Sequence, residues 1–236
     1  AGVYTVGDST ADFGSLNEAV SALQQRGAVD TVSFNVLDGQ YEEQINLENL
    51  NGISQSVPLI IQSQSGNPAS VVFSQPSGLV EYHIFRFREV SGVVLRNVSI
   101  KVLGYDRVDN LVLLDNGATH ILLDGVHLNG NYWTYEAGRL LTIINGSYYT
   151  THDITIKNCE FRNGNRSIVA NGAAYQSVHY NWQLISNSFV WDESTDPYSA
   201  LYFDNIDSLV LDGNTIEFLH PTNALDFSCG TQIILR

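Results

Sequence analysis

The residue types best suited to hold a ligand in this sequence are aromatic rings and polar groups beside short apolar runs. Sugars pack their C–H faces on rings, and their hydroxyl groups bond to amides, carboxylates and guanidinium groups. We therefore predict a carbohydrate-binding surface made of Arg86, Arg88, Asp115, Tyr132, Trp133, Tyr135, Asn145, Tyr148, Tyr149 and Tyr202. Other rings between the apolar runs are Tyr105, Tyr175, Tyr180, Trp182, Trp191 and Tyr198. The strongest candidate is Trp133, because two tyrosines flank it in an otherwise polar segment.

The elements that must position these residues form a repeat. A bend residue recurs about every 26 to 33 residues, always Asn or Gly: Asn97, Gly125, Asn158, Asn187 and Gly213. These two types adopt a left-handed backbone at least cost. A second column closes a strand in each repeat, at Asp115, Asn145, Asn171, Asp204 and Ser228. Because both columns recur once per repeat, they predict one all-β domain over residues 1–236. Its expected fold is a right-handed parallel β-helix with three strands per coil. An antiparallel β-sandwich would not produce such columns of equivalent residues.

Alternation along a strand assigns each column to the core or to the outer face. The first strand of each coil sends residues such as Phe85, Val112 and Thr142 inward, and the third strand does so with Cys159, Ser188 and Val190. The outward column is mostly apolar: Arg86, Leu113, Ile143, Val169, Tyr202 and Asp226. Exposed contiguous apolar surface marks an interaction site, so the strip is either open to a ligand or covered by the long loops.

The N-terminal segment has a different pattern. Ser15 is an N-cap with Glu18 three residues later, which predicts one short helix over about residues 15–26. The order of helix, strand, DGQYEE and strand over residues 12–47 resembles the entry of pectin-methylesterase-like right-handed parallel β-helices. The resemblance implies that the helix caps the open end of the solenoid.

The catalytic residues of those enzymes do not carry over to this chain. The resemblance implies a pair of Asp residues on neighbouring coils, but Asp115 and Asp204 are expected three coils apart, ~14 Å. Motifs of polygalacturonase-like enzymes are also missing from the sequence. Asp204 and Asp226 could meet the separation of ~6.5–9.5 Å that inverting hydrolysis needs. The simplest expectation for Arg88 is a surface ion pair with Asp115. We assign no catalytic residue.

Charge and composition limit the partners. With 11 Lys and Arg against 25 Asp and Glu, the net charge of −14 argues against nucleic acid and anionic membranes. No cofactor is expected, although the acidic loop Asp192, Glu193 and Asp196 makes bound calcium possible. The six histidines show no zinc-binding pattern, and the two cysteines are expected to be buried free thiols.

In fold and size the whole chain resembles the β-helical xylan-binding modules of bacterial xylanases. The resemblance implies a non-catalytic carbohydrate-binding module for a plant cell-wall polysaccharide, with xylan favoured. It also implies a secreted, extracellular protein with a tethered catalytic domain in a longer parent chain. Two alternatives stay open: a polysaccharide lyase or glycoside hydrolase acting on pectin or hemicellulose, and a surface adhesin or structural solenoid.

Overall fold

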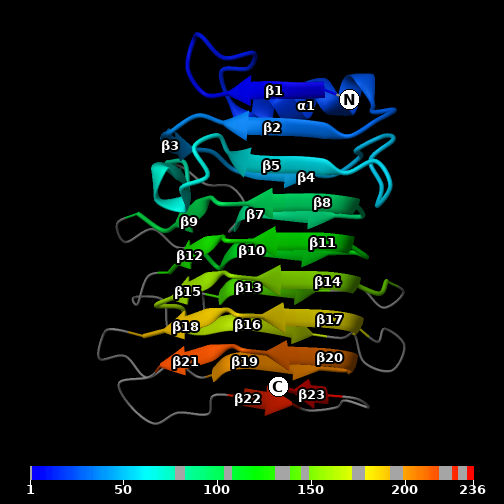
Figure 1. Ribbon diagram of the computed structural model, residues 1–236, viewed down its shortest axis with the longest axis vertical. Coiled ribbons are helices and arrows are strands. Elements are labelled where there is room, and N and C mark those ends of the chain that lie inside the picture. Colours follow the sequence, from blue (N-terminus) through cyan, green and yellow to red (C-terminus); the bar gives the residue numbers. More distant parts are fainter. Residues whose placement is uncertain are drawn as a thin grey trace.

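The computed structural model describes residues 2–77, 83–103, 108–130, 139–144, 149–171, 179–191, 199–217, 225–227 and 233–236, with the backbone alone at position 144. The described strands stack into a solenoid whose axis is vertical in Figure 1. Every strand pairs in parallel with its counterpart one coil away, which confirms the predicted β-solenoid with three sheets.

Sheet A has nine strands: β1 (Gly2–Val6), β2 (Val32–Val36), β5 (Leu59–Ser63), β8 (Ser91–Arg96), β11 (Thr119–Asp124), β14 (His152–Lys157), β17 (His179–Ile185), β20 (Ile206–Asp212) and β23 (Ile233–Leu235). Sheet B has seven short strands: β3 (Gly39–Glu42), β6 (Val71–Ser74), β9 (Ser99–Lys101), β12 (His127–Asn129), β15 (Glu160–Arg162), β18 (Ser188–Val190) and β21 (Thr215–Glu217). Sheet C also has seven: β4 (Ile45–Leu47), β7 (His83–Arg88), β10 (Asn110–Asp115), β13 (Arg139–Ile144), β16 (Arg166–Asn171), β19 (Ser199–Asp204) and β22 (Leu225–Phe227).

The predicted helix is confirmed as α1 (Leu16–Arg26). The side chain of Ser15 accepts a hydrogen bond from the Glu18 backbone N–H, and Gly27 ends the helix with a φ of 69°. Its apolar stripe, Leu16, Ala19, Val20 and Leu23, belongs to the same buried cluster as the strands. The helix therefore closes the N-terminal end of the core, behind β1 in Figure 1. A single turn of 3₁₀-helix, η1 (Pro68–Ser70), precedes β6.

Left-handed bend residues between sheets A and B confirm the main repeat, with one correction. Asn97, Gly125, Asn158 and Gly213 have φ values of 51°, 65°, 54° and 61°. In the remaining coil the bend residue is Ser186, with a φ of 54°, and the predicted Asn187 is wrong by one position. Asn187 points inward instead and is buried. Its amide donates to the Ile156 carbonyl at 2.9 Å and accepts from the Cys159 N–H at 3.0 Å, so a polar residue fits the core.

Two predicted strand registers are also wrong by one residue. In β13, Leu141 pairs with Val112 and Ile143 with Leu114, so Thr142 faces outward and Ile143 inward. Ile144 takes the place expected for Asn145, which lies outside the described residues. In β18, Phe189 pairs with Phe161, and their buried rings stack with centroids 4.8 Å apart. Ser188 and Val190 therefore face outward, because a slip of one residue exchanges the two faces of a strand.

Candidate functional site

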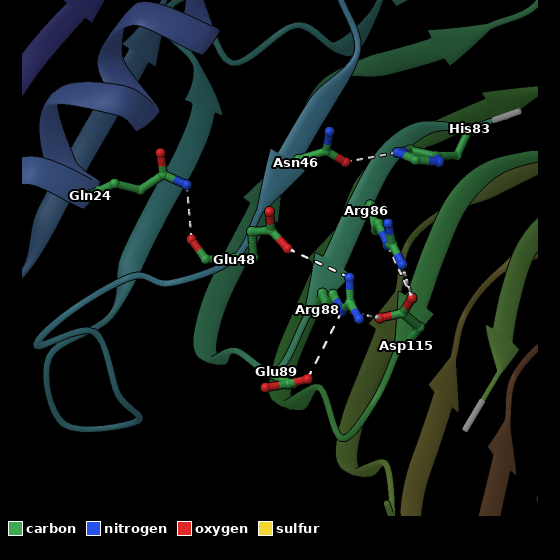
Figure 2. Close-up of polar contacts among 8 residues, drawn as sticks. All are labelled: Gln24, Asn46, Glu48, His83, Arg86, Arg88, Glu89 and Asp115. Atoms are coloured by element: carbon green, nitrogen blue, oxygen red, sulfur yellow. Dashed lines mark hydrogen bonds and ion pairs between the residues drawn. The ribbon is translucent and has the colours of Figure 1, made fainter. Parts of the chain in front are cut away.

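The N-terminal part of the outer face of sheet C holds a compact set of ion pairs (Figure 2). Asp115 Oδ2 accepts from Arg86 at two atoms, Nε at 3.0 Å and Nη2 at 2.5 Å. Arg88 Nε lies 3.9 Å from the other oxygen, Oδ1. The predicted Arg88–Asp115 ion pair is present, but the forked guanidinium of Arg86 is the closer partner of the carboxylate.

The neighbouring polar groups on this face also have partners within the chain. Arg88 lies 4.0 Å from Glu48 and 3.9 Å from Glu89, and the His83 ring is 2.8 Å from the Asn46 side chain. The main-chain oxygen of Glu48 in turn accepts from Gln24 of the capping helix. Three predicted binding residues, Arg86, Arg88 and Asp115, are thus linked to one another by ion pairs, and the Arg88 side chain is 39% exposed.

The outward apolar strip is buried in the middle of sheet C. Thr142 and Val169 face outward, yet both side chains are fully buried. Val169 also lies outside the main core cluster, so it is buried on the far side of the sheet from the core. Farther along the strip, Tyr202 is half-buried and the guanidinium of Arg166 lies 4.9 Å from its ring centroid. The strip is thus buried at these two positions, whereas Leu113 and Tyr202 are partly exposed and Asp226 is exposed.

The predicted aromatic residues divide into three groups. Tyr149 is 43% exposed beside the backbone of Gly117. Trp182 and Trp191 are buried, and their ring N–H groups lie near the carbonyls of Thr151 and Gly164, so they are core residues and not ligand contacts. Five predicted site residues lie outside the described residues, and one of them is the strongest candidate, Trp133. The five are Tyr132, Trp133, Tyr135, Asn145 and Tyr148.

A polar ladder on the outer face of sheet A was not predicted. The ladder runs along the first residues of successive strands, where five coils in a row have a positive φ: Gly92, His120, Asp153, Asn181 and Ser208. A positive φ is uncommon in residues other than Gly, and such strained positions cluster at functional sites. At two of these positions, His120 and Asp153, the side chain contacts residues of both the coil before and the coil after it.

Asp153 is the centre of this ladder. Its Oδ2 lies 2.7 Å from His152 Nδ1 and 3.3 Å from His120 Nε2, and its Oδ1 accepts from the Asn181 side-chain amide. Burial would raise the pKa of Asp153, but the hydrogen bonds from His152 and Asn181 outweigh burial and lower it below its ordinary value. Asp153 is therefore a carboxylate at neutral pH.

The far side of His120 contacts a hydroxyl group. Ser91 Oγ in β8 lies 3.2 Å from His120 Nδ1 in β11. A carboxylate only accepts hydrogen bonds, so an imidazole proton on His120 Nε2 would face Asp153, and Nδ1 could then accept from the Ser91 hydroxyl. Ser91, His120 and Asp153 thus form a continuous chain across three adjacent strands, with the His120 and Asp153 side chains 26% and 29% exposed.

An aromatic edge borders the same ladder. The Tyr180 ring in β17 stacks on His152 with centroids 4.4 Å apart and planes at 8°, and Tyr180 is 40% exposed. His152 also makes an edge contact with His120, at 5.7 Å. Tyr149 lies three residues before His152, the first residue of β14. We call Tyr149, His152 and Tyr180 the tyrosine edge.

Two further features bear on chemistry. Burial raises the pKa of the Cys159 thiol to about 12, which confirms a buried, unreactive thiol, whereas Cys229 lies outside the described residues. Within the described ranges, no three His, Cys, Asp or Glu side chains are arranged to hold a metal ion. The predicted calcium residues Asp192, Glu193 and Asp196 lie outside those ranges. Among the residues described, no helix is long and apolar enough to cross a membrane.

Comparisons with known proteins show the fold. No protein-family model and no curated protein matches the sequence. Among solved structures the chain is similar to a pectin methylesterase from Aspergillus niger, at 14% identity over 98% of this chain and 86% of that chain, with a TM-score of 0.50. The chain is a right-handed parallel β-helix. A rice weevil pectin methylesterase aligns at 14% identity over 91% of this chain and 64% of that chain, with a TM-score of 0.48. Identities this low show the fold alone, so no residue role is transferred.

Proposed function

We propose that this chain binds a polysaccharide through the tyrosine edge of sheet A. The observation that carries the proposal is the pair of exposed rings, Tyr149 and Tyr180, of which the second is held flat against His152. A ring that is already fixed loses little side-chain entropy when a sugar packs on it. The ladder alongside supplies side-chain oxygen and nitrogen atoms for sugar hydroxyl groups.

The charge of the chain favours a neutral or weakly charged glycan. A net charge of −14 repels polyanions such as demethylated pectin, so xylan is the plant cell-wall polysaccharide that we favour. The likeness to a pectin methylesterase, whose name records action on a polysaccharide, supports this class of partner. We also propose that the protein is extracellular and that a catalytic domain is tethered to it in a longer chain.

The test is affinity electrophoresis in native gels that contain xylan, pectin or β-glucan. Retardation by xylan is expected for the wild type. Tyr180→Ala should weaken binding about five- to a hundredfold, if a sugar face stacks on the ring with the roughly 1–3 kcal/mol that a nucleobase contributes. Tyr149→Ala should act in the same direction. Trp133→Ala tests the site that the sequence favours.

The matched control is Tyr4→Ala in β1. Tyr4 is 38% exposed, which is close to Tyr180, but it packs on Phe13 and Phe34 at the N-terminal end of the solenoid. Its loss should leave retardation unchanged. If Tyr4→Ala and Tyr180→Ala behave alike, or if no polysaccharide retards the wild type, the proposal is wrong.

A further inference from the structure

The chain Ser91–His120–Asp153 has the order of groups that activates a serine hydroxyl for attack on a carbonyl. Ser91 Oγ is 3.2 Å from His120 Nδ1, and His120 Nε2 is 3.3 Å from Asp153 Oδ2. Heavy-atom distances of about 2.6–3.2 Å, often somewhat longer without substrate, allow a base to take a proton from the nucleophile. A histidine oriented by a carboxylate is recognised by geometry and not by its place in the sequence.

We propose that Ser91, His120 and Asp153 form a nucleophilic site for hydrolysis of carboxylic esters on the outer face of sheet A. Ser91 is the nucleophile and His120 the general base, while Asp153 is a positioning residue that holds His120 in the Nε2-protonated form. Small acyl groups carried by a polysaccharide are the natural substrate class if the tyrosine edge binds such a chain, and that part of the inference rests on the proposed function.

The reaction balances with water as its only co-reactant. Ser91 Oγ forms a bond to the ester carbonyl carbon while its proton passes to His120 Nδ1. The bond from that carbon to the alcohol oxygen breaks, and the alcohol leaves with the proton from His120. Water then attacks the acyl group on Ser91 by the same route, which releases the acid and restores the serine hydroxyl.

Three features of the ladder favour a catalytic over a purely structural role. The chain is partly exposed, so an ester can reach it. Both His120 and Asp153 have a positive φ, 52° and 55°, although neither is glycine. Asp153 also accepts from His152 and Asn181, and these fixed donors keep its carboxylate in place without protonating it. The three residues come from adjacent strands, where side chains are held at the strand spacing of about 4.8 Å.

The site can be tested with diisopropyl fluorophosphate, which phosphorylates an activated serine and releases fluoride. Peptide mass spectrometry should find the label on Ser91 of the full chain, and p-nitrophenyl acetate should be hydrolysed at a rate that saturates with substrate. Ser91→Ala should abolish both signals. His120→Asn should slow labelling about a hundredfold or more, since a general base contributes at least that factor. Asn is chosen because it tolerates a positive φ.

Asp153→Asn separates positioning from stability. This variant should also slow labelling about a hundredfold or more. In addition, the ¹⁵N resonances of His120 should report the Nε2-protonated form in the wild type and lose that preference in the variant, which ties slower labelling to the orientation of His120 and not to unfolding. Melting temperatures confirm that each variant is folded.

Ser33→Ala is the matched control. Ser33 also faces outward from sheet A, but its hydroxyl lies 3.3 Å from Asn35 Oδ1 and takes part in no chain with a histidine. Labelling must be unchanged in this variant. The proposal is overturned if Ser91 is labelled no faster than Ser33, or if His120→Asn labels like the wild type. The labelling and hydrolysis assays use small molecules, so a negative result in them does not bear on retardation by polysaccharide. Loss of retardation, in turn, does not bear on the labelling of Ser91.

Discussion

In the positive-φ column of sheet A the first side chain is that of His120, because the equivalent position in the coil before it, Gly92, has no room for one. Gly92 occupies the first position of the positive-φ column, with a φ of 78°. A Cβ at Gly92 would lie 2.0 Å from the Ser54 carbonyl oxygen and 2.2 Å from its carbon. The turn that carries Ser54 is closed by hydrogen bonds in both directions with Val57, so it has little freedom to move away. Gly92→Ala is therefore a sharp perturbation of the packing beside Ser91.

Two terms make up the expected loss of stability. A positive φ in alanine costs roughly 1–2 kcal/mol relative to glycine. The clash requires the turn to move by roughly 1.5 Å to restore ordinary contacts, and overpacking of this kind costs about 1–3 kcal/mol. Gly66→Ala isolates the first term, because its φ is 73° but a Cβ there meets only the Asn97 amide at 4.0 Å.

Thermal unfolding of the two variants measures the difference. For a domain of this size each kcal/mol shifts the melting temperature by about 2–4 °C. Gly92→Ala should therefore melt roughly 2–12 °C below Gly66→Ala. Equal melting temperatures would refute the reasoning, since they would mean that the Ser54 turn moves aside freely and that the ladder has no steric limit at this coil.

Three further predictions concern buried polar groups. Asp115→Ala should lower the free energy of unfolding by about 1.5–3 kcal/mol in urea, because it removes a charged partner from the partly buried Arg86. Asn187→Leu should cost about 3 kcal/mol, because the Ile156 carbonyl and the Cys159 N–H lose their buried partner. Burial lowers the pKa of His179, against backbone hydrogen bonds that raise it, so the unfolded chain binds its proton more readily. The stability that the protein has above the ordinary histidine pKa of 6.5 should therefore be lost as the pH drops through the lower pKa of folded His179. Urea unfolding at a series of pH values measures this loss, and His179→Gln should not show it.

The architecture could be predicted from the sequence because each coil repeats the same local physics. A bend residue that accepts a positive φ recurs at Asn97, Gly125 and Asn158, and apolar residues alternate on either side of it. The same preference caused the error at Asn187. Asn tolerates a left-handed backbone better than Ser does, so residue type favours Asn187, whereas its amide is needed inside the core and Ser186 takes the bend.

The register of β13 could not be settled by residue type. Leu140, Leu141, Ile143 and Ile144 are all apolar, so two registers one residue apart bury nearly the same side chains. The structure resolves the ambiguity by pairing Thr142 with Leu113, so Thr142 and not Ile143 lies in the outward column beside Val169. A shift of one residue therefore decides which side chain of β13 enters the outward column and which enters the core.

The ladder on sheet A was missed for a reason that applies to every solenoid. Metal and catalytic sites are usually sought as linear patterns, and Ser91, His120 and Asp153 are about 30 residues apart with no pattern between them. Their common signal is the start of each sheet A strand, visible when SGVVLR, THILLD, HDITIK, YNWQLI and DSLVLD are aligned on their first core residue. In a parallel β-helix, residues in neighbouring coils at the same position are neighbours in space. Binding and catalytic sites in this fold are therefore found by comparing equivalent positions in neighbouring coils. The alignment of the coils must be correct before any residue is given a role.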